Sequence, residues 1–306
     1  MTRKQRYTNI DHADTSTSLA DLLKWQLERR AKKKDLADTI KQAPFKEVDT
    51  LVNNRSEMSI TWIGHSTFLI QMNGLNLITD PVWAKRMGFG KRLTEPGIAL
   101  VDMPAIDVVC ISHSHYDHLD FPTLKRLKGN PTYFVPVGLG RAFNKRGYNK
   151  VVEGSWYDSF EHRGLKISFV PAQHWTKRTL TDTNTSHWGG WIIENEERSI
   201  YFAGDTAYFK GFEDIEKRFD IDIVLMPIGA YEPEWFMKAT HITPEDAVKA
   251  FLELNAKMFI PMHYGAYHLA DDTGPEAITR LDAEWQRLGL DPAELKKLLI
   301  GETLWP

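Results

Sequence analysis

The segment Ile111-Ser112-His113-Ser114-His115-Tyr116-Asp117-His118-Leu119-Asp120 holds four potential metal ligands within six positions. The apolar run 107–111 before it is typical of a buried strand, and the residues 120–124 after it predict a capped helix start. In an extended segment His113 and His115 point to the same side and can share one cation. The turn that follows brings Asp117 and His118 toward a second cation. The pattern therefore favours a loop that binds two metal ions over a chance meeting of polar residues.

The composition is that of a large globular protein. The chain has 306 residues, of which 42% are hydrophobic and 26% charged, and its formal net charge is −3. Without a basic field, nucleic acid is not an expected partner. The single cysteine, Cys110, lies in the apolar run before the metal-binding segment, so we expect a buried thiol and no disulfide. No secretory leader and no run near the roughly 18 apolar residues of a membrane span is recognisable, so we expect a cytoplasmic protein.

Residues 1–55 are expected to form an amino-terminal helical extension, followed by one domain over 56–306 that carries the metal-binding segment. Within the extension, 16–40 has a helical pattern with an apolar stripe and a charged run over 28–35. That run is either a solvated helix face or a patch that contacts anionic lipid headgroups at the inner membrane surface. The assembly is left open, with a homodimer as one expectation. The apolar stripe consists of Leu19, Leu22, Leu23 and Leu27.

Strand-like and helical segments alternate over the rest of the chain. Asn73 and Gly74 join the runs 66–72 and 75–79 and are typical of a two-residue hairpin. Asp80 ends the second run. It is expected either to accept a hydrogen bond from a metal-binding imidazole or to form a turn before proline.

Three further potential ligands, His174, Asp205 and His263, each follow a predicted strand. Stacked sheets tend to present strand ends along one edge, so these side chains are expected to meet the metal-binding segment. The combined set predicts one cation on His113, His115 and His174, a second on Asp117, His118 and His263, and Asp205 bridging the two.

These motifs, in this order, resemble those of the metallo-β-lactamase superfamily. The resemblance implies an α/β (α+β) fold, a four-layer αβ/βα sandwich of two mixed β-sheets flanked by helices, with a dinuclear site on one edge. From about residue 60 to the end, the chain is also similar to the N-acylphosphatidylethanolamine-hydrolysing phospholipase D family. The segments that carry this likeness include Trp62-x-Gly64-His65, Thr79-Asp80-Pro81, Gln173-His174-Trp175 and Gly229-Ala230-Tyr231-Glu232-Pro233.

The resemblance implies an enzyme, a zinc-dependent phosphoric diester hydrolase that releases N-acylethanolamine and phosphatidic acid from a phospholipid. Manganese and iron(II) are the alternative metals. The resemblance places His241 and Tyr231 near the substrate. Lys177 and Arg178 are expected to attract the anionic headgroup, and a role as ordinary surface charges has equal weight.

The chemistry expected of the catalytic residues follows from their types. Asp117 would orient the attacking water and take its proton, and Asp205 would balance the charge of two cations. Asp80 would fix an imidazole, and His241 would donate to a phosphoryl oxygen or to the leaving alkoxide.

Three other functions compete with this interpretation. The first is another hydrolase on the same site, such as a lactonase, a nuclease or a small-molecule phosphodiesterase. The second is an iron redox protein, which usually has Glu where His115 stands and needs a flavin domain. The third is a binding protein with a decayed site, which the complete ligand set opposes.

Overall fold

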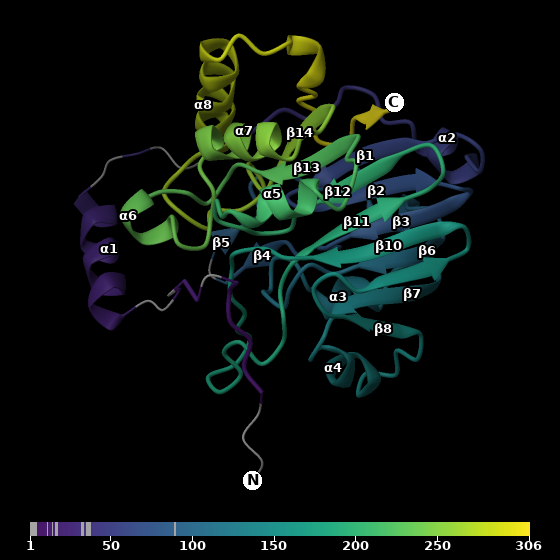
Figure 1. Cartoon of the computed structure of the whole chain (residues 1–306), viewed down its shortest axis with the longest axis horizontal. Helices are drawn as coiled ribbons and strands as arrows, with labels where there is room; N and C mark the ends of the chain where they lie inside the picture. The colour runs from purple at the N-terminus through teal and green to yellow at the C-terminus, as the bar shows by residue number, and fades with distance from the viewer. Residues whose placement is uncertain are drawn as a thin grey trace.

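The computed structural model describes residues 5–10, 12–13, 15, 18–31, 34, 38–88 and 90–306. Two large β-sheets pack face to face, and helices cover the outer face of each (Figure 1). The expected fold, a four-layer sandwich of mixed sheets flanked by helices, is confirmed.

The first sheet has seven strands in the order β15-β1-β2-β3-β6-β7-β8. Strands β1, β2 and β3 form an antiparallel meander, and β3, β6, β7 and β8 are parallel. Asn73 and Gly74 join β2 to β3, and both have positive φ, as this two-residue turn requires. The strands are β1 (Ser59–Gly64), β2 (Thr67–Met72), β3 (Leu75–Thr79), β6 (Ile106–Cys110), β7 (Gly129–Pro136), β8 (Val151–Gly154) and β15 (Thr303–Leu304).

The second sheet has six strands in the order β14-β13-β12-β11-β10-β9. Neighbours from β9 to β12 are antiparallel, and β12, β13 and β14 are parallel. A small hairpin of β4 (Arg86–Met87) and β5 (Gly90–Lys91) lies outside both sheets. The strands of the second sheet are β9 (Ser159–His162), β10 (Leu165–Val170), β11 (Gly190–Glu194), β12 (Ser199–Phe202), β13 (Ile223–Pro227) and β14 (Met258–Met262).

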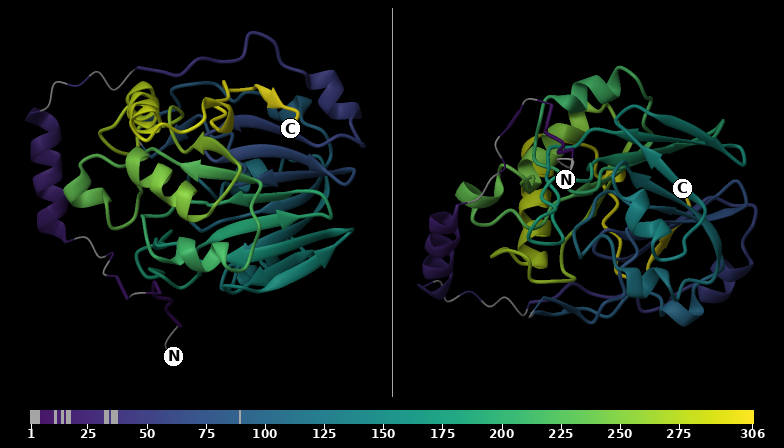
Figure 2. Two further views of the ribbon diagram at one scale, coloured as in Figure 1. Left: turned by 45° about the horizontal axis from the view of Figure 1, so that its top comes forward. Right: turned by 90° about the horizontal axis from the view of Figure 1, so that it is seen from below.

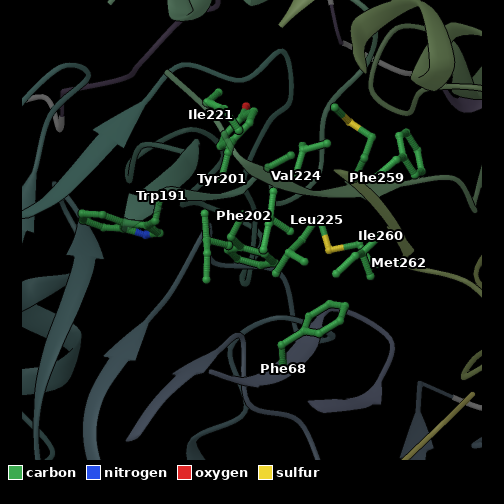
Figure 3. Close-up of a cluster of buried hydrophobic side chains, with 14 of the residues drawn as sticks. Phe68, Trp191, Tyr201, Phe202, Ile221, Val224, Leu225, Phe259, Ile260 and Met262 are labelled. Atoms are coloured by element: carbon green, nitrogen blue, oxygen red, sulfur yellow. The ribbon is translucent and has the colours of Figure 1, made fainter. Parts of the chain in front are cut away.

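The strands of the first sheet bury both of their faces. In β6, Val108 and Cys110 belong to the core between the sheets, while Ile106 and Val109 belong to the core beneath the outer helices. Figure 3 shows Phe68 of the first sheet facing Phe202 of the second across the inner core. The thiol of Cys110 is buried and free, as expected.

Helices close the two outer faces of the sandwich. Within the described ranges, no helix is long and apolar enough to cross a membrane. The first sheet is covered by α2 (Val48–Asn53), α3 (Phe121–Leu124) and α4 (Gly140–Asn144), and the second by α5 (Gly211–Glu216), α7 (Pro244–Glu253) and α8 (Gly274–Arg287). Three shorter elements complete the chain: η1 (Leu100–Asp102), α6 (Glu234–Met237) and η2 (Pro292–Glu294).

The amino-terminal helix α1 (Leu19–Ala31) lies at the side of the sandwich, next to α6 (Figures 1 and 2). It is shorter than the helix expected over 16–40, because residues 38–40 are not helical. Residues 16, 17, 32, 33 and 35–37, which include three positions of the charged run over 28–35, lie outside the described part of the chain. Trp25 faces the protein, packs on Phe236 and donates a hydrogen bond to Asp271.

Candidate metal centre

The potential ligands lie at the ends of strands that run in the same direction. In each sheet these strands end at the same edge, so the residues that follow them meet there. Gly204, just before one ligand, has a positive φ, and a Cβ there would lie 2.6 Å from Cβ of Ser112. Only glycine therefore allows the two sheets to approach so closely. The residues concerned are His65 after β1, Asp80 after β3, 113–118 after β6, His174 after β10, Asp205 after β12 and His263 after β14.

The loop 111–120 after β6 is held in place from both sides. Its carbonyl groups accept hydrogen bonds from the Trp191 indole (2.8 Å, at Ile111) and from the amide of Gly189 (3.2 Å, at Ser112). Asp120 then caps α3 through the amide of Thr123, as predicted. The ligand side chains therefore project from a fixed main chain.

Three imidazoles form the first ligand group. Nδ1 of His115 lies 2.8 Å from Nε2 of His113 and 3.2 Å from Nε2 of His174. Burial lowers the pKa of all three, that of His115 to about 4. The three rings are therefore neutral near pH 7 and present lone pairs to one point, as a metal ion requires.

A carboxylate and two imidazoles form the second group. Oδ2 of Asp117 lies 3.4 Å from Nε2 of His118 and 3.6 Å from Nε2 of His263. His263 comes from the second sheet, so this group also joins both halves of the sandwich. These three residues fall within one set whose ligand atoms lie within 4.8 Å of one another.

Asp205 lies between the two groups. Its Oδ2 is 3.1 Å from Nε2 of His118, 3.8 Å from that of His174 and 3.9 Å from that of His113. Its Oδ1 is 3.1 Å from Nε2 of His263. One carboxylate can thus reach a cation in each group.

The charges of the second group already indicate a place for cations. Burial would lower the pKa of His118, but the carboxylates of Asp205 and Asp117 raise it well above its usual value. For His263 burial is likewise outweighed by Asp205, which raises the pKa to about 9. Protons on these imidazoles balance carboxylates that bound cations would otherwise neutralise.

Several buried polar atoms at the centre find no hydrogen-bond partner among the described residues. They include Nε2 of His118, Oδ1 of Asp205 and both ring nitrogens of His263. Burying such atoms without a partner is unfavourable, so their convergence on one point fits a bound cation. The side chains present therefore suit the metal ions that the sequence predicts.

Asp80 lies behind the second group and orients one of its ligands. It accepts hydrogen bonds from the Ser112 amide at 2.7 Å, from the Ser112 hydroxyl and from Nδ1 of His118 at 2.7 Å. A carboxylate that contacts the outer nitrogen of an imidazole fixes the inner nitrogen as the metal ligand. With its oxygens used in this way, Asp80 supports the centre from outside.

Comparison with known proteins agrees with this geometry. The model of the β-lactamase superfamily domain matches residues 75–264, well over half of the chain. The chain belongs to the β-lactamase superfamily. It is 39% identical over 238 residues to N-acyl-phosphatidylethanolamine-hydrolyzing phospholipase D 1 of Caenorhabditis elegans, which covers 70% of this chain and 66% of that protein. It is 34% identical over 295 residues to an uncharacterized protein of Mycobacterium tuberculosis, covering 91% of this chain and 78% of the relative.

Solved structures show the same superfamily fold. A possible metal-dependent hydrolase from Veillonella parvula superposes with a TM-score of 0.65 at 15% identity, covering 82% of this chain and all of the other. That structure shows the fold, and the family match together with the phospholipase relative confirms the expectation of a metal-dependent hydrolase of this superfamily.

His241 flanks the superfamily centre on its partly exposed side. Its Nδ1 lies 3.9 Å from Oδ2 of Asp205, and its ring centre lies 5.1 Å from that of His174. Burial lowers the pKa of His241 to about 4. A neutral imidazole here can donate an N–H hydrogen bond to a substrate that reaches Asp205.

The structure places the other expected substrate residues differently. Tyr231 is fully buried, with the guanidinium of Arg280 over its ring, and has no surface for a substrate. Arg178 is occupied by the metal loop: one guanidinium nitrogen donates to the carbonyls of Ser114 (2.7 Å) and Leu119 (2.8 Å). Arg178 therefore holds the metal loop, and its contact with an anionic headgroup stays a prediction. Lys177 is exposed to solvent.

Two site residues were not expected from the sequence. Oδ1 of Asn9 accepts hydrogen bonds from the amide of His174 (3.0 Å) and from the indole of Trp188 (2.9 Å). Nothing in the pattern around Asn9 distinguishes it from a polar residue of a tail. His65 is the other, and its position at the end of an apolar strand, like that of Asp80, is the signal that could have found it.

Proposed function

We propose that the protein is a zinc-dependent phosphodiesterase of the phospholipase D type, which converts N-acylphosphatidylethanolamine to N-acylethanolamine and phosphatidic acid. The observation that carries the proposal is the position of Asp205 between two ligand groups, with His241 beside it. A phosphodiester is an anion with a poorly reactive phosphorus, so its hydrolysis needs both an activated water and concentrated positive charge. The similarity to the C. elegans phospholipase supports the lipid substrate.

Two divalent cations would be held by the two groups with Asp205 shared. Imidazole-rich sets with carboxylates suit zinc, and manganese or iron(II) are the alternatives. Bound there, such ions lower the pKa of a water molecule toward about 7 and neutralise charge on the phosphoryl oxygens.

The residues of the chain then have separate tasks. A water between Asp117 and Asp205 gives its proton to Asp117 while its oxygen forms the new bond to phosphorus. The bond from phosphorus to the ethanolamine oxygen breaks, and the proton leaves with the neutral alcohol. His241, neutral near pH 7, donates a hydrogen bond to a phosphoryl oxygen. Asp80 keeps His118 in the ligating tautomer throughout.

The proposed partner surface is a membrane, which α1 would contact. Leu19, Leu23 and Leu27 are 79%, 66% and 66% exposed, and they lie on the face opposite Trp25. Arg30 is exposed and, viewed down the helix axis, projects between Leu19 and Leu23, where it can contact anionic headgroups. α1 packs on α6, and the chain continues from α6 directly to His241, so contact here would hold lipid close to the centre.

Vesicle binding tests this contact. Replacing the three leucines by Ser should reduce cosedimentation with anionic phospholipid vesicles at least tenfold. Val101→Ser is the matched control, since Val101 is 70% exposed but lies in η1. Unchanged vesicle binding would contradict the membrane contact, and a loss of self-association in its place would show that a second copy of the chain covers the stripe.

A substrate panel tests the reaction. Zinc-loaded protein is assayed on N-acylphosphatidylethanolamine vesicles, a soluble phosphodiester, a lactone and a thioester, with Asp205→Asn as the inactive control. We expect the lipid to be the best substrate and oxygen from labelled water to appear in the phosphatidic acid. Label in the alcohol would mean attack at carbon, and a faster lactone or soluble-phosphodiester reaction would favour those hydrolases over the lipid enzyme.

A further inference from the structure

His65 is a buried imidazole next to the metal centre that none of the tasks above uses. It lies in the turn between β1 and β2, and its residue is 2% exposed. Its Nε2 is 3.2 Å from Oδ2 of Asp117. That oxygen is also the one that the ligand nitrogens of His118 and His263 approach. His65 thus contacts the second ligand group at the atom that a cation would bind.

The main chain of His65 adopts a left-handed conformation. Its φ is +57°, in the left-handed region that favours glycine or asparagine. Non-glycine residues persist in this region where the surrounding structure holds them there. Two-residue turns between antiparallel strands use this conformation, so the turn accounts for the φ of His65 and the role of its side chain must be argued from its contacts.

Both sheets hold His65 in place. Its carbonyl accepts hydrogen bonds from the amide of His263 (3.2 Å) and from the indole of Trp62 (2.9 Å). Its ring centre lies 4.2 Å from that of His263, and the ring of Tyr267 meets it edge-on at 5.4 Å. The imidazole is therefore positioned before any cation binds.

We propose that His65 is a positioning residue for the second cation. Its Nε2–H donates to Asp117 and so fixes the rotation of that carboxylate toward His118 and His263. Without this donor, Asp117 is free to turn, and the second cation loses one ligand of correct geometry. Partners of this kind typically change metal affinity about 10–100-fold. The first group, which His65 does not contact, should be unaffected.

The test compares His65→Gln with His65→Phe. The amide nitrogen of Gln stands where Nε2 stands and can still donate to Asp117, whereas Phe fills the space without a donor. Zinc is titrated into the metal-free protein in competition with a chromophoric chelator, which resolves the two sites. We expect His65→Phe to weaken the second site 10–100-fold with the first unchanged, and His65→Gln to restore most of that loss.

Controls separate this role from packing. His187→Phe makes the same change at a buried histidine outside the ligand groups and should leave both affinities unchanged. Thermal unfolding of each metal-free variant shows whether it folds. Cobalt(II) replaces zinc as a spectroscopic probe, and only His65→Phe should alter the visible spectrum of the second site.

Two results would overturn the proposal. Normal affinity of both sites in a folded His65→Phe protein would show that Asp117 needs no partner. Equal losses in Gln and Phe, with loss of one imidazole from the X-ray absorption spectrum, would make His65 a direct ligand. The proposal rests on the dinuclear centre, and its failure is distinguishable: a wild-type protein that binds fewer than two cations refutes the proposed function itself.

Discussion

Nδ1 of His118 lies 2.7 Å from the carboxylate of Asp80, which also accepts the amide of Ser112. In Asp80→Asn the amide oxygen would keep the Ser112 contact, so the NH2 group would face Nδ1. Two donors cannot share this contact, so His118 would move its proton to Nε2 and lose its lone pair toward the centre. We expect second-site zinc affinity to fall about 10–100-fold in a chelator competition.

The control for this change is Asp107→Asn. Asp107 lies at the opposite end of the same sheet region and pairs with the exposed Arg163. Its replacement should leave zinc binding unchanged. Equal zinc affinity in Asp80→Asn and wild type would remove Asp80 from the support of the centre.

The two ligand groups should lose metal independently. His113→Ala removes one nitrogen from the first group, and His263→Ala removes one from the second. Each variant should retain about one zinc per chain after dialysis, since Asp205 and three other ligands still serve the intact group. Elemental analysis measures this ratio. Loss of both ions from each variant would show that the groups form one cooperative site.

Asn9 should stabilise the first group from a distance in the sequence. Asn9→Ala leaves the amide of His174 without its acceptor, while the indole of Trp188 keeps the carbonyl of Ala172. Leaving buried donors unpaired costs about 1–3 kcal/mol. We expect a lower unfolding midpoint in urea and faster zinc loss from the first site. Asn9→Asp, which keeps an acceptor oxygen, should behave more like wild type, and an unaltered Asn9→Ala protein would contradict this role.

His187 should make the protein less stable in acid. Its ring lies between Tyr7 and Trp156, with centroid distances of 4.5 and 4.1 Å, and burial lowers its pKa from 6.5 to about 4. Below pH 6.5 the imidazole of His187 is protonated in the unfolded chain, whereas in the folded protein it becomes protonated only near pH 4. The free energy of unfolding therefore falls as the pH falls through this window, by about 3 kcal/mol in total.

His187→Asn keeps an acceptor for the amide of Trp188 and removes the titrating group. Urea unfolding of metal-free protein between pH 4 and 7 measures the difference. The wild-type curve should fall more steeply than that of the variant. Parallel curves would show that His187 becomes protonated without unfolding.

The ligand set could be predicted because two simple signals coincide. Apolar runs locate β6, β10, β12 and β14, and a histidine or aspartate follows each of them. Parallel directions then place those residues at one edge, whatever the details of the loops.

The supporting contacts could not be predicted, because each depends on segments that are remote in sequence. In the sequence His65 resembles a turn residue. Its link to the metal centre depends on the amide of His263, which donates to its carbonyl in the structure. The sequence leaves the guanidinium of Arg178 free to bind a substrate anion. In the structure one of its nitrogens donates to the carbonyls of Ser114 and Leu119.

The outward leucine stripe of α1 has a similar cause. The periodicity predicts an apolar face but does not tell which face is buried. In the structure the opposite side faces the protein, through Trp25 and the ion pair of Arg29 with Asp271 at 3.2 Å. Trp25 and Arg29 find partners on the protein in Phe236 and Asp271, whereas the three leucines stay exposed.

Each ligand group takes side chains from both sheets, with consequences for how the domain holds together. His113 and His118 extend from the first sheet, and His174, Asp205 and His263 from the second. Bound cations would therefore act as cross-links between the two halves of the sandwich, much as a disulfide fastens two layers. Binding only to the folded state would add stability by mass action, about 4 kcal/mol at a thousandfold excess over Kd. Removal of the cations by a chelator would then separate the two sheets first at the edge that carries the ligands. The same residues would thus bind the metal ions and hold the two sheets together.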